Sequence, residues 1–369
     1  MKRIAVADPA MVKLTGHNRE LNLIRSAEYV ARGYQVDIYA NKQYPVSDID
    51  QNLNGVRIIP HFSTSPYFFN LAEQEALGAD GYLESQAKSF ASELQLIGND
   101  CPLLLPSAYP YLICGAALAG WEHPVHGVIH RKPDFLMYRP SEHWRVAFKK
   151  SLSLRKPLGV HVLEPVLQGI YAKYAEGAVR IRLAPYPLHP FVKTSIKRQS
   201  NCVAILGGLR PEQGLEFVPA VVNSLVTSGF RLVVQDPAGR LNGASHPAVK
   251  IISFVEDFRM PMQSCSALLL NYDPASYATS TSGVAWEALA TGTPVIYSRG
   301  TASANTFHNY NCGLAFDYGS IDQIHRAVLR LHQNYSKHLE LAEAAAKKVR
   351  NLHSVKRFVD HLSESGFLS

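Results

Sequence analysis

The sequence predicts an α/β protein of two doubly wound domains. Short β-branched or aliphatic runs alternate with longer helical patterns along almost all of its 369 residues. Such alternation is typical of parallel sheets that helices cover on both faces. A chain of this length exceeds what one ordinary hydrophobic core organises, which favours two domains. A proline-rich break at residues 184–200 marks the boundary between them.

The elements alternate regularly in both halves of the chain. The predicted strands of the first half are Arg3–Ala7, Gln35–Tyr39, Val56–Ile59, Leu103–Leu105, Val125–His130, Leu158–His161 and Val179–Ala184. Its predicted helices are Asn18–Arg32, Asn70–Ile97, Tyr111–Trp121, Glu142–Leu152 and Glu164–Ala175. The predicted strands of the second half are Cys202–Leu206, Arg231–Gln235, Val249–Ile252, Ala267–Asn271, Pro294–Tyr297 and Leu314–Phe316. Its predicted helices are Leu215–Ser228, Val284–Thr291 and Ile321–Gln333, and after Asn334 the pattern is helical to the end.

The break between the halves, APYPLHPFVKTSIKRQS, has three prolines and no clear period, which is the composition of a linker. We therefore expect an N-terminal domain over residues 1–184 and a C-terminal domain over residues 185–350. A last helix, at about 351–369, is expected to pack back on the first domain. Two such domains facing each other leave a cleft at the carboxyl ends of their strands, where open α/β sheets bind ligands.

Positive charge gathers in one segment. The formal net charge is +7, and residues 131–156 hold eight basic and two acidic residues, a local charge of +6. A basic patch can meet nucleic acid, an anionic membrane or an anionic small substrate. The chain has no recognisable nucleic-acid-binding module, so nucleic acid is not an expected partner.

The cysteines and apolar runs indicate a cytoplasmic protein. The five cysteines are scattered singly, without the paired spacing of a zinc site or a disulfide framework. The N-terminus enters a strand directly, without an apolar signal core. The most apolar stretch, residues 103–120, is interrupted by Pro106 and Pro110 and is too broken for a spanning helix. Any membrane contact is therefore expected to be peripheral, at the inner face.

The segment Tyr277–Phe316 holds the best candidates for binding a phosphorylated ligand. Ser282 and Gly283 stand where a loop enters a helix, so backbone amides and a hydroxyl are available to an anion. About one turn later, the carboxylate of Glu287 can accept hydrogen bonds from vicinal ribose hydroxyls, as the acidic residue of dinucleotide sites does. The alternative is a helix with a surface glutamate and a tight helix–strand turn.

The run SGVAWEALATGTPVI, with GLAFD after it, resembles the donor-site signature of retaining GT-B glycosyltransferases of family four, the glycosyl transferases group 1. In that family, E-x7-E and A-x-A-x-G-x-P-V-V precede a G-L-L-V element. The resemblance implies a nucleoside-diphosphate sugar as donor, retention at the anomeric carbon, and no metal or other cofactor. It assigns ribose binding to Glu287. Thr279 stands where the family has its first glutamate and becomes a candidate for contacting the sugar or phosphate.

A second element of the resemblance is LGGLRPEQG, residues 206–214. The family usually has G-R-L-x-x-x-K-G here, with the Arg and Lys neutralising the donor diphosphate. Gly207 matches the first glycine, Gly208 replaces that Arg and Gln213 replaces that Lys. Arg210 can reach the same phosphates, because its planar fork binds phosphate oxygens bidentately. The alternative is that Arg210 is a solvated loop residue.

Two elements of the first half are candidates for the acceptor and sugar side. Gly16 permits a close approach, and His17 and Asn18 can serve as helix cap and ligand. The resemblance places this loop beside the acceptor, and an ordinary N-cap by Asn18 is the competing account. His130 ends a predicted parallel strand, where a polar side chain faces the ligand edge. The resemblance implies that His130 approaches the transferred sugar, which makes it a catalytic candidate together with Arg210.

Two further patterns have competing interpretations. In the basic segment 139–156, Trp144, Phe148 and Leu152 recur every fourth residue beside basic side chains. Such a helix can lie on an anionic bilayer, and the alternative is a domain helix that packs this stripe into the core. Asp48-Ile49-Asp50 spells the DxD metal motif of a different transferase fold, and we interpret it as a solvated acidic loop.

These patterns predict a metal-independent, retaining hexosyltransferase. Its donor is expected in the C-terminal domain, and its acceptor is a glycan, a lipid-linked or another molecule of bacterial surface polysaccharide or glycoconjugate biosynthesis. Stabilising the negative charge that grows on the departing diphosphate is the expected catalytic task. The alternatives are a GT-B-fold nucleotide-sugar epimerase or hydrolase, and a non-catalytic GT-B-like binding protein.

Overall fold

The computed structural model consists of two compact units, residues 1–187 with 355–369 and residues 188–354, here called the first and second units. The residues it describes are 2–14, 17–51, 53–67, 70–133, 140–191, 197–241, 246–253, 259–280 and 282–368, with the side chains of His17, Ile49, Pro140 and Ser141 left out. That residues 1–184 and 185–350 fold as separate domains stays a prediction.

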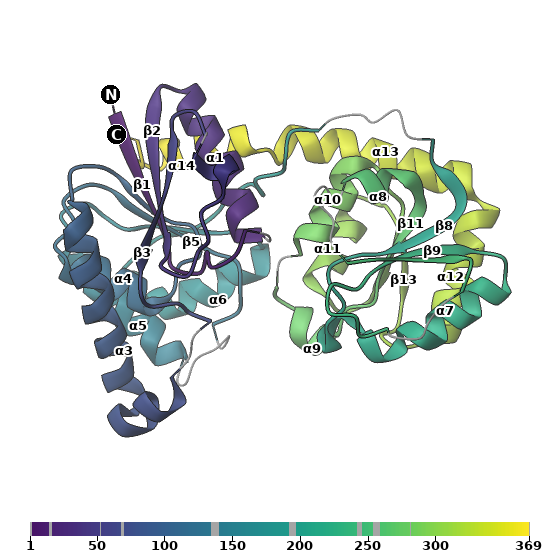
Figure 1. Cartoon of the computed structure of the whole chain (residues 1–369), viewed down its shortest axis with the longest axis horizontal. Coiled ribbons are helices and arrows are strands. Elements are labelled where there is room, and N and C mark those ends of the chain that lie inside the picture. Colours follow the sequence, from purple (N-terminus) through teal and green to yellow (C-terminus); the bar gives the residue numbers. More distant parts are fainter. Residues whose placement is uncertain are drawn as a thin grey trace. The chain divides into compact units, whose positions relative to one another are not determined.

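The first unit is built on a parallel sheet in the order β3-β2-β1-β4-β5-β6-β7. Its strands are β1 (Lys2–Asp8), β2 (Tyr34–Asn41), β3 (Val56–Phe62), β4 (Leu103–Leu105), β5 (Val125–Ile129), β6 (Gly159–Val162) and β7 (Ile181–Leu183). Its helices are α1 (His17–Ala31), α2 (Asp48–Gln51), α3 (Leu71–Ile97), α4 (Pro110–Leu118), α5 (Pro140–Lys150), α6 (Pro165–Ala175) and α14 (Val355–Glu364). Helices α3 to α6 pack against one another in sequence, whereas α14 packs against α1 (Figure 1).

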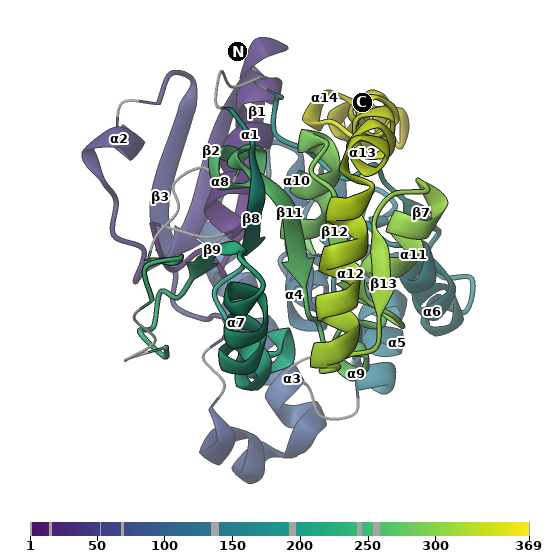
Figure 2. The ribbon, with the colours of Figure 1, turned by 90° about the vertical axis from the view of Figure 1, so that its right-hand side faces the viewer.

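The second unit repeats this architecture with the order β10-β9-β8-β11-β12-β13. Its strands are β8 (Gln199–Ile205), β9 (Arg231–Gln235), β10 (Val249–Ile252), β11 (Cys265–Leu270), β12 (Val295–Ser298) and β13 (Leu314–Phe316). Its helices are α7 (Val218–Thr227), α8 (Arg259–Ser264), α9 (Pro274–Tyr277), α10 (Gly283–Thr291), α11 (Ala302–Asn309), α12 (Ile321–Gln333) and α13 (Tyr335–Leu352). Figure 2 looks onto this unit, with α7 and α12 in front of the sheet.

Burial explains why the strands form where they do. Strands β4, β5, β6 and β11 are buried at every position, as expected for strands covered by helices on both faces. The fold class predicted from the alternation, α/β with two Rossmann-like parallel sheets, is confirmed by the strand pairing and order. None of the helices in the described part of the chain is long and apolar enough to cross a membrane.

Two interpretations of the sequence need correction. The DxD segment is not a solvated loop: it begins α2, and Asp50 is buried, with its carboxylate 2.6 Å from Arg19 Nη2 and 2.8 Å from the Tyr44 hydroxyl. A buried carboxylate persists because these donors replace its lost water. The predicted helix Leu215–Ser228 begins only at Val218, after a short 3-10 turn, because Pro219 suits the first helical turn.

Candidate functional site

The candidate donor site lies at the switch point of the second sheet. Strand order reverses between β8 and β11, because β9 and β10 extend the sheet on one side and β12 and β13 on the other. In open α/β sheets the loops after two such strands part and leave room for a ligand. The loop after β8 carries the LGGLRPEQG element, and Asn271–Asp273 comes directly after β11.

The glycines of the β8 loop adopt left-handed backbone conformations. Gly207 has φ 114° and Gly208 has φ 86°, values that side chains on Cβ disfavour. A Cβ on Gly207 would lie 3.2 Å from Gln213 Nε2 and 3.5 Å from Val284 Cγ2, so the loop runs directly beside the start of α10. The Gly207 amide donates to Gln235 Oε1 at 2.9 Å. Among the described residues, the amides of Gly208 and the next residue have no partner.

Helix α10 begins with unsatisfied amides. Ser282 is its N-cap, and the Ser282 hydroxyl accepts from Ala285 N at 3.2 Å. Within the described parts of the chain, the amides of Gly283 and Val284 bond to no acceptor. The end of a helix concentrates a partial positive charge on such groups. The loop and the helix start therefore present several donors to one place, an arrangement suited to an anion.

Arg210 is linked to this helix start through two tyrosines. Its Nη2 donates to the Tyr277 hydroxyl at 2.9 Å, and its Nε lies 3.2 Å from Glu212 Oε1. The Tyr277 ring stacks on Tyr272, with centroids 4.3 Å apart, and the Tyr272 hydroxyl is 3.1 Å from Ser282 Oγ. Burial raises the pKa of Tyr272, which keeps its phenol protonated. About half of the Arg210 side chain is exposed, so its guanidinium is accessible to a ligand.

Gln213 and Thr279 take different places around the loop. The Gln213 side chain is buried, and its Oε1 accepts from Arg210 N at 3.2 Å, so it holds the loop's backbone. Thr279 is half-buried between α9 and α10, and its Oγ1 has no hydrogen-bond partner among the described residues. Thr279 Oγ1 is thus a buried oxygen without a described hydrogen-bond partner, whereas the Gln213 amide serves the loop itself.

Glu287 lies in the second turn of α10 and has a partner that the sequence did not suggest. Its Oε1 is 2.6 Å from Nδ1 of His189, whereas Oε2 has no partner within the described residues. The side chains of both are mostly buried. His189 stands in the proline-rich segment interpreted as a linker. The pair leaves one carboxylate oxygen to accept hydrogen bonds from a ligand.

Sequence reasoning also missed a second cation at the glycine loop. Arg240 Nη1 donates to Leu209 O at 2.8 Å. The rule that singled out His130, a polar side chain at the carboxyl end of a parallel strand, would also have found Gln235 and Tyr272. Arg240 lies five residues after β9 and has no such local signal. Arg299, another cation near a strand end, is held by Asp317 at 2.6 Å.

In the first unit, the corresponding switch point lies between β1 and β4. Asp8 ends β1 and is fully buried. Its carboxylate accepts from Ala10 N at 3.1 Å and from the side-chain amides of Asn22 at 2.7 Å and Asn18 at 3.3 Å. Burial raises the pKa of Asp8, and these hydrogen bonds partly offset that effect.

This arrangement changes the account of the acceptor loop. Helix α1 begins at His17, so Asn18 lies inside the first turn and is not the N-cap. The Asn18 side chain instead donates to Asp8, because a buried carboxylate requires donors. Gly16 and the side chain of His17 lie outside the described residues.

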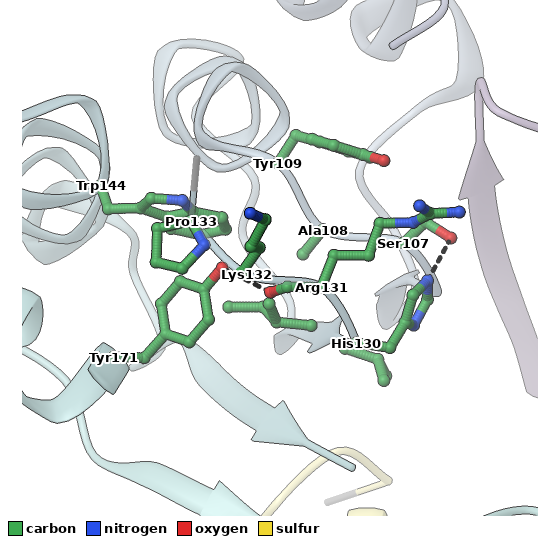
Figure 3. A pocket seen from close by; sticks show the side chains of 11 residues that line it. Ser107, Ala108, Tyr109, His130, Arg131, Lys132, Pro133, Trp144 and Tyr171 are labelled. Carbon is green, nitrogen blue, oxygen red and sulfur yellow. Dashed lines mark hydrogen bonds between the residues drawn. The ribbon is translucent and has the colours of Figure 1, made fainter. Parts of the chain in front are cut away.

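His130 comes directly after β5 and lines a small cavity (Figure 3). Its Nε2 is 3.3 Å from Ser107 Oγ, and Tyr171 donates to the carbonyl of Arg131 at 2.9 Å. The cavity measures ≈ 20 Å³, which is room for about one water molecule. Trp144 lines this cavity as well. Because of its small volume, the cavity beside His130 cannot hold a sugar in this state.

Metal ligands do not gather in the described part of the chain: no three His, Cys, Asp or Glu side chains there could hold a metal ion together. Metal independence remains a prediction.

The whole chain is similar to several solved structures. Sucrose-phosphate synthase from Thermosynechococcus elongatus is 16% identical over 100% of this chain and 99% of that chain, with a TM-score of 0.71. Anabaena HepE in complex with UDP-glucose is 13% identical over 99% of both chains, with a TM-score of 0.66. WaaG, a glycosyltransferase involved in lipopolysaccharide biosynthesis, is 15% identical over 98% of this chain and 99% of that chain, with a TM-score of 0.64.

No protein-family model and no curated protein sequence matches the chain. At these identities the similarity establishes the fold. The chain has the GT-B fold of two Rossmann-like units, as the sequence predicts.

Proposed function

We propose that the chain is a glycosyltransferase that moves a sugar from a nucleoside-diphosphate sugar to an acceptor hydroxyl. The observation that carries the proposal is the set of free amides at the glycine loop and the α10 start, with Arg210 beside them, at the switch point of the second sheet. The UDP-glucose complex of a protein with the same fold supports this assignment.

In this proposal the second unit binds the donor. The diphosphate lies against the amides of Gly208, Gly283 and Val284, and Oε2 of Glu287 accepts from the ribose hydroxyls. A helix N-terminus contributes about half a charge, less than the leaving diphosphate carries. Arg210 supplies the missing positive charge as the glycosidic bond breaks and negative charge grows on the diphosphate. Arg240 reinforces the field at the loop.

The finer features of the reaction rest on the resemblance of SGVAWEALATGTPVI to family-four enzymes. We propose transfer of a hexose with retention and without a metal ion. Thr279 contacts the sugar or phosphate in place of the family's first glutamate. His130 and the loop of Gly16, His17 and Asn18 serve the acceptor and sugar side. The cavity beside His130 must widen to admit a sugar, which ligand binding is expected to cause.

We further propose a cytoplasmic role in bacterial polysaccharide or glycoconjugate synthesis, with contact to the inner membrane face through 139–156. Arg139 lies outside the described residues. Trp144 and Phe148 are buried in the core, so the aromatic anchor that the sequence suggested is not available to lipid. The contact would use exposed Lys150 and Leu152 instead. Sedimentation with anionic vesicles tests this contact. We expect the Lys149→Glu/Lys150→Glu variant to sediment with the vesicles less than the parent protein does. If the parent protein does not bind the vesicles, the membrane contact is wrong.

The proposal is tested by calorimetric titration of UDP, GDP and ADP with and without a chelator, and then by product analysis with the matching sugar nucleotides. We expect one nucleotide to bind equally well in both conditions and its sugar to be transferred to an added acceptor. Strict dependence on magnesium or manganese would remove the metal-free mechanism.

A non-catalytic binding protein is the second candidate. The observation that favours it is the ion pair of Arg210 with Glu212, which adds to the replacements at Gly208 and Gln213. Failure to bind any nucleoside diphosphate or sugar nucleotide would support this candidate, since a protein that only binds a partner needs no donor site. Binding of a sugar nucleotide with transfer of its sugar would contradict it.

A further inference from the structure

A second basic cavity lies in the first unit, at the edge of its sheet. It measures ≈ 470 Å³ and is formed by the edge strand β7, helix α6 and helix α14. Its lining includes Gln168 of α6, Arg180, Arg182 and Leu183 at β7, and His361 and Glu364 of α14. Its volume falls within the range of small-molecule sites.

The positive charge of this cavity is only partly compensated. Arg180 is exposed and Arg182 half-buried, and neither pairs with a carboxylate in the described residues. Burial lowers the pKa of Arg182, and the charge of Arg180 lowers it further, which reflects the missing counter-ion. Glu364, which is exposed at the rim, is the one acid among the lining residues and leaves a net positive charge.

A chain of buried histidines holds His361 in place. His361 Nε2 lies 3.1 Å from His161 Nδ1, and His161 Nε2 lies 2.9 Å from His126 Nδ1. Gly159 makes room for this stack, since a Cβ there would lie 2.5 Å from the His126 ring. Burial lowers the pKa of His126 to about 3 and also lowers those of His161 and His361, so the chain is neutral at pH 7.

A neutral chain of this kind has two tautomeric states. In one, protons point towards His126, and Nδ1 of His361 is a bare acceptor. In the other, His126 donates to His161, His161 donates to His361, and Nδ1 of His361 carries a proton. An anion in the cavity favours the second state, because Nδ1 of His361 then becomes a hydrogen-bond donor.

We propose that this cavity binds a phosphate-bearing anion, held by Arg180, Arg182 and His361. Two guanidinium forks and one imidazole N–H match the several oxygens of a phosphate group better than the two oxygens of a carboxylate. The volume exceeds that of a phosphate, and Ile181 and Leu183 offer apolar contacts for an organic substituent. The ligand is either a free phosphorylated molecule or the headgroup of an anionic lipid. The site is separate from the candidate donor site, which is built entirely from the second unit.

The test uses the full chain, inorganic pyrophosphate and vesicles of phosphatidylglycerol or phosphatidylcholine. The variant is Arg180→Gln/Arg182→Gln. The matched control is Arg326→Gln/Arg330→Gln, which removes two exposed arginines from α12. Thermal unfolding verifies that both variants fold. The ¹⁵N shifts of the His361 side chain report this site alone, whatever binds in the second unit.

Pyrophosphate is expected to shift the ¹⁵N resonances of His361. The Arg180→Gln/Arg182→Gln variant should bind pyrophosphate at this site at least tenfold more weakly than the parent, whereas the control variant should keep the parent's affinity. That result identifies a free phosphorylated ligand. If the Arg180→Gln/Arg182→Gln variant loses binding only to phosphatidylglycerol vesicles, the ligand is a lipid headgroup. If neither probe depends on the two arginines, and the His361 shifts do not move, the proposal is wrong. Because UDP binding by the second unit is measured separately, failure of this site leaves the proposed function untouched.

Discussion

The two units share the order of their first six strands, and the first unit adds β7 at one edge. They differ in the residues at the carboxyl end of their first strand. In the second unit, β8 leads into Gly207 and Gly208, which have no side chains above the sheet edge. In the first unit, β1 ends in Asp8, whose carboxylate is buried at the corresponding place. The backbone around Asp8 is already bonded, with Ala10 N donating to its carboxylate and Met11 N to its carbonyl.

This difference assigns opposite electrostatic roles to equivalent edges. The glycine loop presents unsatisfied N–H groups, so it can accept phosphate. The Asp8 loop contains a buried carboxyl group that has used the nearby donors, so it offers none of them to an anionic ligand. This contrast fits the proposed function, in which the diphosphate lies in the second unit and the acceptor hydroxyl approaches from the first.

The largest expected effect is that of Arg210→Ala on turnover. The charge of the leaving diphosphate develops in the transition state, so the loss belongs mainly to kcat, which we expect to fall about 100-fold or more. Arg210→Lys should retain only part of the parent's kcat, because lysine cannot bind the phosphate oxygens bidentately. Steady-state kinetics with the sugar nucleotide that binds checks this.

Arg240→Ala is the matched control for this prediction, since Arg240 touches the same loop through Leu209 O. It should affect turnover less than Arg210→Ala. The reverse order would identify Arg240 as the cation that assists departure. A third variant, Glu212→Gln, removes the ion-pair partner of Arg210 and should change turnover only a few-fold, as is usual for an exposed pair.

Glu287→Ala is expected to weaken binding of the nucleotide itself, because its Oε2 accepts from the ribose. Loss of hydrogen bonds to a charged group costs about 1.5–3 kcal/mol, which corresponds to roughly 10- to 150-fold in affinity. Calorimetry with UDP and with its 2′,3′-dideoxy analogue tests the assignment. The parent should lose affinity for the analogue, whereas the variant should bind both nucleotides alike; equal losses in both proteins would exclude Glu287 from the ribose site.

The smallest effect concerns the first unit and is seen only in the pH dependence of stability. The folded-state pKa of Asp8 is raised above 3.8, so folding favours its protonated form. The free energy of unfolding therefore falls as pH rises from about 3.8 through the raised pKa. Asp8→Asn should lack this fall. Urea denaturation of both proteins from pH 4 to 8 measures it, and parallel curves would contradict the prediction.

Local patterns predicted much of the fold and part of the site. Leu103–Leu105, Arg231–Gln235 and Val249–Ile252 form strands with the predicted bounds. The start of α10 at Gly283 differs from the prediction by one residue, because Ser282 is a strong capping residue. Periodicity and capping act over a few neighbouring residues, and the sequence displays them directly.

Pairings between distant residues could not be predicted in this way. Asp50 is buried because Arg19, 31 positions away, neutralises it. Arg210 meets Tyr277 across 67 positions, and Glu287 meets His189 across 98. A single sequence contains no local sign of such partners, because the fold alone brings them together. The roles of the site residues stay predictions for the same reason.

The most direct test of the central claim is to give the second unit the carboxylate of the first. Gly208→Asp places an acid in the glycine loop, where a Cβ meets only Pro237 Cγ, at 3.7 Å. Gly208→Asn has nearly the same shape and the same backbone strain at φ 86° but no charge. Both variants are titrated by calorimetry with the nucleoside diphosphate that the parent binds. The Asp variant should bind it at least about 100-fold more weakly than the Asn variant, because a like charge beside a desolvated diphosphate costs several kcal/mol. Equal affinity in the two variants would mean that the diphosphate does not lie on this loop.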